Sequence, residues 1–257
     1  MQAILLAGGR IEPDDPFYGL ISTETKSMTP ICGKPMVQWV LDALSGSKVI
    51  EKIYVIGLAE KSELFSKKPL VFLHDQGGIF DNIHFGVEKI VKKSANDETI
   101  MVVSGDIPAL TSEMVDWLGT QIEGDSYDIY YSTVTRQVME TSFPGSNRSY
   151  VHFKDIEVCG GDINIINSRV FNQANDLWKR LSESRKSPMK QAALIGFSTL
   201  ILVLLKAITL DGAAKRICRK LKIRGKALRV PYAEMAMDVD KLHQLEIMKA
   251  FLSEKVC

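Results

Sequence analysis

A short apolar run that ends in two glycines constrains the fold of this chain most strongly. Ala3 to Ala7 are all hydrophobic, Gly8 and Gly9 follow, and a long polar loop leads to Lys26. An uninterrupted apolar run of this length is typical of a strand buried in a parallel sheet. Paired glycines let the backbone approach a ligand, backbone amides bind phosphate oxygens, and a lysine adds positive charge. The segment therefore predicts a strand and an anion-binding loop, with a tight turn as the simpler alternative.

Strand-like and helix-like patterns alternate along the chain. Buried-strand patterns occur at 52–58, 70–74 and 100–103, and helical patterns at 36–45 and 83–92. Such alternation is typical of parallel strands joined by right-handed helical crossovers. The length of 257 residues and the 46% hydrophobic content fit one domain with a sizeable core. We predict a single α/β domain over 1–257, with a three-layer α/β/α fold and a mostly parallel, Rossmann-like sheet.

The start of the chain resembles a known enzyme family. Leu-Leu-Ala-Gly-Gly at 5–9, followed by Lys26-Ser-Met-Thr-Pro-Ile-Cys-Gly-Lys-Pro35, is similar to the opening of MobA-like nucleotidyltransferases of the molybdenum-cofactor and sugar-nucleotide type, which have a GT-A-like fold. The resemblance implies that the glycine loop holds a nucleoside triphosphate and that Lys26 neutralises it. It assigns nucleotide binding to Leu6, Ala7, Gly8, Gly9, Arg10 and Lys26. Arg10 stands in for the family's loop arginine, because a longer segment at 10–24 replaces the usual Gly-x-Ser/Thr-Arg-Met.

An aspartate follows the strand pattern at 100–103, in the order Ser-Gly-Asp106-Ile-Pro. Ligands of open α/β sheets bind beyond the carboxyl ends of the strands, and a carboxylate at that position suits Mg²⁺ bound to nucleotide phosphates. In the family, a metal-binding aspartate occupies this same context. The resemblance therefore implies Mg²⁺ or Mn²⁺ at Asp106 and a nucleotide contact at Gly105. Capping of a turn by Asp106 is the structural alternative.

A glycine-rich segment at 75–86 precedes the next helix pattern. In the family, loop groups at this place read the base and the ribose, so the resemblance assigns nucleotide binding to Asn82. The alternative is a turn at 77–78 with Asp81 as the cap of the helix.

A second glycine pair, later in the chain, runs into an apolar strand pattern. In relatives a glycine-rich strand here lines the acceptor pocket, and the resemblance assigns acceptor binding to Gly161, Asp162 and Asn164. The geometry of strand entry alone is the alternative explanation for these residues. Arg148 and His152, in the preceding loop and edge strand, are expected at the surface, with contact to the acceptor as the alternative.

The sequence Met-Asp-Val-Asp before the final helix pattern is similar to the family's terminal signature. Asp240 matches the second metal ligand. Two aspartates at alternate positions of an extended chain point the same way, so Asp238 and Asp240 are both expected to face the metal. Helix capping by Asp240 is the alternative. Gln244 and Leu242 stand where the family usually has an acidic residue and a proline.

The segment 179–229 has a charge of its own. It contains fourteen Lys or Arg and two acidic residues, a net charge of +12, whereas the rest of the chain carries −11. The apolar-rich run at 192–205 is shorter than the about 20 residues that a membrane span needs, and residues 213–225 have the pattern of a basic amphipathic helix. We predict a basic helical excursion near 170–225, with a helical insertion at about 186–224 that docks on an anionic membrane or on a second subunit. Packing of this helical pair onto the domain's own core is the alternative.

The ordered set of motifs predicts an Mg²⁺-dependent nucleotidyltransferase, which transfers NMP from an NTP to a phosphorylated small-molecule acceptor and releases pyrophosphate. Lys26, Asp106 and Asp240 are the predicted catalytic residues, and the two aspartates hold the metal with Asp238. The alternatives are a GT-A-like glycosyltransferase and a catalytically weakened, nucleotide-binding or membrane-associated regulatory protein. No nucleic-acid partner is expected. Four scattered cysteines without a pairing pattern suit a cytoplasmic protein, peripheral at the membrane if the insertion docks there.

Overall fold

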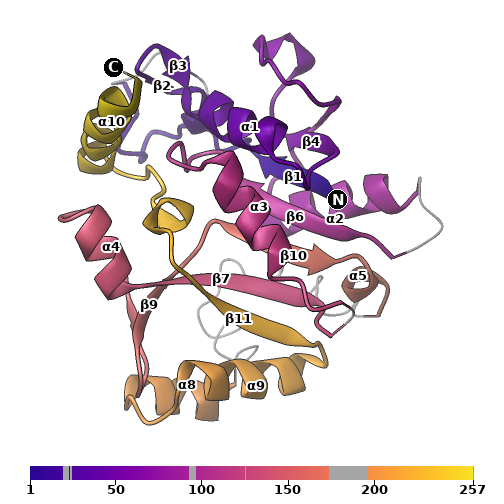
Figure 1. The fold of residues 1–257 in the computed structure, drawn as a ribbon, viewed down its shortest axis with the longest axis vertical. Helices are drawn as coiled ribbons and strands as arrows, with labels where there is room; N and C mark the ends of the chain where they lie inside the picture. The colour runs from indigo at the N-terminus through magenta and orange to yellow at the C-terminus, as the bar shows by residue number, and fades with distance from the viewer. Residues whose placement is uncertain (20–22, 24, 93–96, 125, 174–195, 257) are drawn as a thin grey trace.

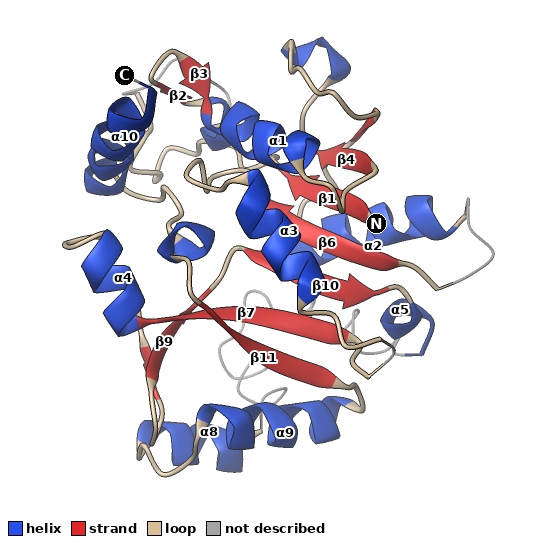
Figure 2. Cartoon of the chain, viewed as in Figure 1, coloured by secondary structure: helices blue, strands red, loops and turns tan. Residues whose placement is uncertain are grey.

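The computed structural model describes residues 1–257 except 20–22, 24, 93–96, 125, 174–195 and 257. A mixed, mostly parallel central sheet runs through the molecule, and helices cover both of its faces (Figures 1 and 2). The strands of this sheet are β1 (Gln2–Leu6), β4 (Lys52–Ile56), β5 (Leu70–Leu73), β6 (Thr99–Ser104), β7 (Ile129–Thr135), β8 (Val151–His152), β9 (Glu157–Gly160), β10 (Ile163–Asn167) and β11 (Gly225–Val230). A separate ribbon pairs β2 (Pro30–Ile31) with β3 (Lys34–Pro35).

Helices follow the strands as the alternating pattern predicts. They are α1 (Met36–Gly46), α2 (Ile79–Val91), α3 (Ser112–Thr120), α4 (Arg136–Ser142), α5 (Arg169–Gln173), α8 (Phe197–Leu204), α9 (Leu210–Leu221) and α10 (Leu242–Val256). Single 3-10 turns occur at Lys26–Met28, Glu60–Ser62 and Ala233–Ala236. Local sequence sets several helix starts: the hydroxyl of Thr111 accepts from the Met114 N–H at the start of α3, and Thr209 does the same for Gly212 at the start of α9.

The strand order explains where a ligand site can form. The sheet runs β5-β4-β1-β6-β10-β7-β9-β8, with β11 paired to β7. The first four strands are parallel, and Leu6 lies opposite both Ile56 and Ser104. The carboxyl ends of β1, β4 and β6 therefore meet at one edge of the sheet, which is where ligands of such sheets bind. The second half mixes directions, because β10 is antiparallel to both β6 and β7.

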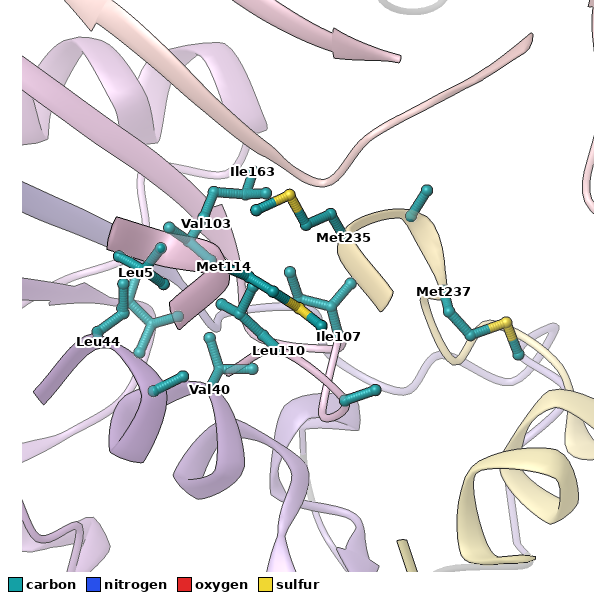
Figure 3. Close-up of a cluster of buried hydrophobic side chains, with 14 of the residues drawn as sticks. Leu5, Val40, Leu44, Val103, Ile107, Leu110, Met114, Ile163, Met235 and Met237 are labelled. Atoms are coloured by element: carbon teal, nitrogen blue, oxygen red, sulfur yellow. The ribbon is translucent and has the colours of Figure 1, made fainter. Parts of the chain in front are cut away.

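The core lies in two layers, one on each face of the sheet. Ala3 and Leu5 of β1 belong to one buried cluster and Ile4 belongs to the other, as the alternation of a strand requires. Figure 3 shows part of the larger cluster, in which Leu5 and Val103 of the sheet pack near Val40 of α1. The smaller cluster includes side chains from α2 and α5. The three-layer α/β/α prediction is thus confirmed.

Two local expectations differ from the structure. Helix α2 begins at Ile79 with Gly78 at its N-cap, so Asp81 lies within the first turn and does not cap the helix. Within the apolar run at 192–205, α8 spans Phe197–Leu204, and the first four residues of the run lie outside the described chain. The part of the basic helical excursion at 174–195 also lies outside it. The basic amphipathic helix is present as α9. Among the described helices, none is long and apolar enough to cross a membrane.

A buried aspartate holds the second half of the sheet together. The side chain of Asp128, 4% exposed, accepts hydrogen bonds from Arg169 Nε at 2.5 Å and from Arg224 Nη2 at 2.8 Å. Its second oxygen accepts from the backbone N–H of Arg224 at 2.8 Å. Burial alone would raise the pKa of Asp128, but the hydrogen bonds from the two arginines lower it from 3.8 to about 2. This carboxylate therefore joins the start of β7 to α5 and to the turn before β11.

Candidate active site

A cavity of about 490 Å³ lies at the carboxyl ends of β1 and β6, where the loops after β1, β5 and β6 meet. This volume is within the roughly 300–1,000 Å³ range of small-ligand pockets. The residues that the sequence assigned to nucleotide binding all line it: Leu6, Ala7, Gly8, Gly9, Arg10, Lys26, Asn82 and Gly105. Asp106 lines it as well. The fold thus brings four separate stretches of sequence to one place.

Two glycines set the distance between the loops that follow β1 and β4. Gly57 has a φ of +97°, and a Cβ on it would lie 2.1 Å from the Cα of Gly8. A Cβ on Gly8 would lie 2.9 Å from the Cα of Gly57. A Cβ on Gly9, in contrast, would meet no atom of the described chain within 4 Å. Gly8 therefore permits loop packing, whereas Gly9 leaves the backbone open to the cavity.

The long segment at 10–24 is closed at its base. Arg10 and Thr25 form an antiparallel backbone bridge, and the N–H of Lys26 donates to the carbonyl of Gly9 at 2.8 Å. Phe17, within the segment, has an exposed fraction of 0% and belongs to the larger core cluster. These contacts bring Arg10 and Lys26 together at the cavity. The anchor was not predicted, because an isolated aromatic residue in a polar loop gives no periodic signal.

Lys26 lies between the carboxylates of Asp106 and Asp240. Its ammonium is 3.1 Å from Asp106 Oδ2 and donates a hydrogen bond to Asp240 Oδ1. The other oxygen of Asp106 accepts from the hydroxyl of Ser104 at 2.6 Å, and its carbonyl accepts from the N–H of Val239 at 3.0 Å. Burial works to lower the pKa of Lys26, but Asp106 and Asp240 raise it above its usual value. The three predicted catalytic side chains therefore form one charged cluster.

Arg148 is largely buried close to this cluster, so its expected surface position was wrong. Its side chain is 14% exposed, and Nη1 donates to Asp238. Its Nη2 is 3.4 Å from the carbonyl of Gly160 and 3.5 Å from Asp162 Oδ2. Asp238, expected beside Asp240 at the metal, instead pairs with this arginine. His152 is partly exposed and contacts Glu157, as expected for the edge strand.

Asp162 lies between the two charged groups. Burial first, and the negative charge of Asp106 second, raise the pKa of Asp162 from 3.8 to about 7, while Arg148 opposes the shift. The backbone holds the residue at both sides, because its N–H donates to Met235 at 2.8 Å and its carbonyl accepts from Ser104 at 2.9 Å. A carboxyl whose pKa is raised in this way keeps its proton to a higher pH than an ordinary aspartate, and in the protonated form it can donate a hydrogen bond.

Asn82 holds the loop after β5 in place. Its Oδ1 accepts from the N–H of Gln76 at 2.6 Å, and its Nδ2 donates to Asp75 Oδ1 at 2.7 Å. The same oxygen of Asp75 accepts from the N–H of Gly77 at 3.1 Å. Asn82 is 8% exposed at the cavity wall, so it shapes the loop at the predicted base-reading position.

Gly161 and Asn164 join the start of β10 to β7. Asn164 Oδ1 accepts from the N–H of Ser132 at 2.8 Å, and Nδ2 donates to the carbonyl of Gly161 at 3.2 Å. A Cβ on Gly161 would lie 2.8 Å from the Cβ of Ser132. The alternative of strand-entry geometry therefore explains these two residues, whereas Asp162 presents its carboxyl to the charged groups.

Residues 3–223 match the family model described as MobA-like NTP transferase domain. The chain belongs to this family. This is the family that the sequence motifs resembled. A structure described as a hypothetical transferase from Thermus thermophilus is 28% identical, with a TM-score of 0.81, and the match covers 95% of this chain and 100% of that one.

Curated relatives of this MobA-like NTP transferase match over part of their length. A probable molybdenum cofactor guanylyltransferase from Thermococcus sibiricus is 27% identical over 125 residues, which are 46% of this chain and 54% of that protein. The bifunctional protein GlmU from Geobacillus sp. is 30% identical over 100 residues, 38% of this chain and 21% of that protein. A CMP:2-keto-3-deoxy-manno-octonic acid synthetase structure with CTP, 16% identical over 99% of this chain and 100% of its own, shares the fold with a TM-score of 0.58.

The donor set at Lys26 suits a hard divalent cation. Asp106 and Asp240 converge on one point from the end of β6 and from the segment before α10, and the ammonium of Lys26 holds positive charge there. Mg²⁺ is usually held by one or two carboxylates together with waters and substrate phosphates. The described residues contain no group of three or more His, Cys, Asp or Glu placed to hold a metal. Two carboxylates would leave the other positions around such an ion to waters and substrate phosphates.

Gln244 supports the site in a way that the sequence did not reveal. Its Oε1 accepts from the backbone N–H groups of Asp240 and Lys241, each at 2.9 Å, and its Nε2 donates to the carbonyl of Ser146 at 3.2 Å. A glutamine three residues into a helix commonly bonds back to the N-terminal amides. Gln244 thus serves the start of α10, and the carboxylate of Asp240 contacts Lys26.

Proposed function

We propose that this MobA-like NTP transferase joins a phosphorylated acceptor to the α-phosphorus of an NTP. An acceptor phosphate oxygen forms the new P–O bond, the bond to the β-phosphate oxygen breaks, and pyrophosphate leaves with that electron pair. The observation that carries the proposal is the convergence of Lys26, Asp106 and Asp240 beside the glycine-loop cavity. These three charged side chains come from distant segments of the chain, and none of them belongs to the hydrophobic core.

The chain's own groups bind and orient the substrates. The open backbone at Gly9, with Arg10 and Lys26, offsets the negative charge of the triphosphate and of the pyrophosphate that leaves. Asp106 and Asp240 hold Mg²⁺ or Mn²⁺, which supplies charge neutralisation on the phosphates when bound. Rate enhancement then comes from positioning two phosphates in line and needs no protein nucleophile.

Arg148 is the proposed anchor of the acceptor phosphate. Its Nε is buried and has no hydrogen-bond partner among the described residues, while its other nitrogens contact Asp238, Gly160 and Asp162. An unpaired buried donor on a charged group is costly, and an acceptor oxygen from a ligand removes that cost. Asp162 lies beside it, and its raised pKa lets it share a proton with a phosphate oxygen.

A pyrophosphate-release screen tests the proposal. Each of the four NTPs is combined with phosphorylated sugars, polyols, lipids and cofactor precursors, with Mg²⁺ or Mn²⁺ and with EDTA as the control. We expect one NTP and one class of acceptor to give metal-dependent pyrophosphate and a new phosphoanhydride. Release of a nucleoside diphosphate from a nucleotide sugar would instead indicate a glycosyltransferase and contradict the proposal, as would nucleotide binding without any transfer.

We also propose that the helical insertion at about 186–224 contacts an anionic membrane surface. Among the described residues of this region, the large exposed apolar side chains are Phe197, Ile201, Leu204 and Leu205, which are 51–72% exposed. The adjacent helix α9 exposes the basic residues Lys215, Arg216 and Arg219. Apolar side chains next to a basic helix face are typical of helices that lie on anionic lipid.

Co-sedimentation with vesicles tests this contact. At low salt we expect more protein on vesicles containing phosphatidylglycerol than on pure phosphatidylcholine, and Leu204→Ser with Leu205→Ser should reduce that fraction. No preference for anionic lipid would contradict the membrane contact, and a dimer that the same substitutions dissociate would assign the surface to a second copy of the chain.

A further inference from the structure

A second cavity lies between α9 and the outer strands of the sheet. It has a volume of about 310 Å³ and is lined by one face of β7, by β9, β11 and α9. Its wall is mainly apolar, with Ile129 and Tyr131 on the strand side and Ala214 and Ile217 on the helix side. Figure 1 shows α9 lying along β11, against which it packs. This volume is at the lower end of the range for ligand pockets.

The apolar cavity adjoins the proposed acceptor site. Gly160 lines the cavity, and its carbonyl is 3.4 Å from Nη2 of Arg148. The hydroxyl of Tyr131 lies 2.4 Å from the position that a Cβ on Gly160 would take, so this side chain lies directly over the glycine. Burial, and then the charge of Asp162, raise the pKa of Tyr131, which agrees with its closeness to that carboxyl. Gly160 and Tyr131 therefore line the cavity and also lie close to the acceptor groups Arg148 and Asp162.

The other walls of the cavity leave apolar surface in contact with solvent. Tyr131 is 48% exposed and Val151 is 45% exposed, although both line the cavity. Helix α8, which carries the exposed apolar residues named above, packs against β8 and α9. Apolar side chains that gather on an exposed surface commonly mark a binding site for a protein, a membrane or a ligand.

We propose that this cavity holds the apolar tail of the acceptor. The acceptor is then a phosphorylated amphiphile, and one of its aliphatic chains lies in the cavity. Its phosphate binds at Arg148 and its chain passes Gly160 and Tyr131 into the space beneath α9. The nearby guanidinium of Arg148 and the apolar walls match the two parts of such a molecule, and the volume suits one chain. The inference rests on the proposed function for the identity of the phosphate site.

Titration with alkyl phosphates tests the tail site without nucleotide or metal. Ethyl, butyl, hexyl and octyl phosphate, each below its micelle concentration, are titrated into the full-length protein by calorimetry. Each methylene taken from water into the cavity should tighten binding roughly fourfold until the chain outgrows the space. Equal affinity for ethyl and octyl phosphate would overturn the inference.

Variants separate the cavity from the exposed apolar surface. Ala214→Phe places a ring in the cavity from the wall of α9 and should weaken octyl phosphate by about tenfold or more while ethyl phosphate binds as before. Ala250→Phe, the same substitution at an exposed position of α10, is the matched control and should change neither. Ile217→Ser makes the wall polar without filling it and should also weaken octyl phosphate, so the test survives if the first variant does not fold. Unchanged octyl phosphate affinity in a folded cavity variant would refute the tail site.

The result is distinguishable from failure of the proposed function. Chain-length-dependent binding that Ala214→Phe removes supports the tail site even if no NTP gives pyrophosphate. Conversely, pyrophosphate release on an acceptor without an aliphatic chain, with octyl phosphate neither binding nor competing, would refute the tail site and leave the nucleotidyl transfer standing.

Discussion

Replacement of Asp128 by asparagine tests how the second half of the sheet is held. The carboxylate is 4% exposed and accepts hydrogen bonds from Arg169 and Arg224. Its pKa falls from 3.8 to about 2 on folding. A shift of about 1.8 units corresponds to roughly 2.4 kcal/mol of unfolding free energy at neutral pH. Asp128→Asn should remove this amount or somewhat more, because Arg169 then loses its buried counter-ion.

The stabilisation by the Asp128 carboxylate decreases at low pH. Because the folded pKa is depressed, the contribution of Asp128 is fully present above about pH 4 and is lost as pH falls through the folded value near 2. The wild-type advantage over Asp128→Asn should shrink from about 2.4 kcal/mol at pH 7 to about 1.3 kcal/mol at pH 3. Urea unfolding curves of both proteins between pH 7 and pH 3 measure this difference in unfolding free energy, which is obtained by linear extrapolation to zero denaturant.

A matched control uses the same substitution at a surface ion pair. Asp42 is 43% exposed and pairs with Lys34 at 2.7 Å, so Asp42→Asn should cost at most about 1 kcal/mol. The reasoning fails if Asp128→Asn is no more destabilising than Asp42→Asn, or if its destabilisation stays constant between pH 7 and pH 3.

Three further substitutions test parts of the site. Gly57→Ala should disturb the glycine loop, because the new Cβ would lie 2.1 Å from the Cα of Gly8 and the φ of residue 57 is +97°. We expect a loss of NTP affinity, and an unchanged affinity in a binding titration would contradict this role of Gly57. Asp162 has a folded pKa of about 7, so its ionisation lowers the unfolding free energy as pH rises from about 4 to 7. Asp162→Asn should therefore be more stable relative to wild type at pH 8 than at pH 5. A difference of the opposite sign in urea unfolding would refute the raised pKa of Asp162. Gln244→Ala should lower the unfolding free energy by about 1 kcal/mol through loss of the bonds at the start of α10, and an unchanged midpoint in thermal unfolding would count against that role.

The sequence predicted the half of the site that follows from strand ends. Ala3–Ala7 and 100–103 are short apolar runs, and parallel pairing of the strands that they form carries Gly8 and Asp106 to the same edge of the sheet. The spacing between Lys26 and the turn at Gly33-Lys34-Pro35 was also informative, because the resemblance to one family rests on it. Local patterns of this kind depend on a few neighbouring residues, so they can be recognised in the sequence without knowledge of the fold.

The other half depends on contacts between distant segments, and the sequence could not give these. Arg148 comes from an irregular loop and meets Asp238 from 90 residues further along the chain. Gly57 matters only because the loop after β1 lies against it. Asp238 was expected to face the metal with Asp240, because alternate residues of an extended chain point the same way. In the structure its partner is Arg148. Such pairings follow from tertiary packing and leave no periodic trace.

The proposed metal-dependent nucleotidyl transfer depends above all on Asp106, whose carboxylate lies beside Lys26. Its most direct test is the rate of Mg²⁺-dependent pyrophosphate release, with the best NTP and acceptor of the screen, for wild type, Asp106→Asn and Asp97→Asn. Asp97 is an exposed aspartate just before the other end of β6 and serves as the control. The account predicts a loss of about a hundredfold or more for Asp106→Asn, with Asp97→Asn and the unfolding midpoints unchanged. Wild-type turnover by Asp106→Asn, or equal pyrophosphate release by the wild type in EDTA, would contradict it.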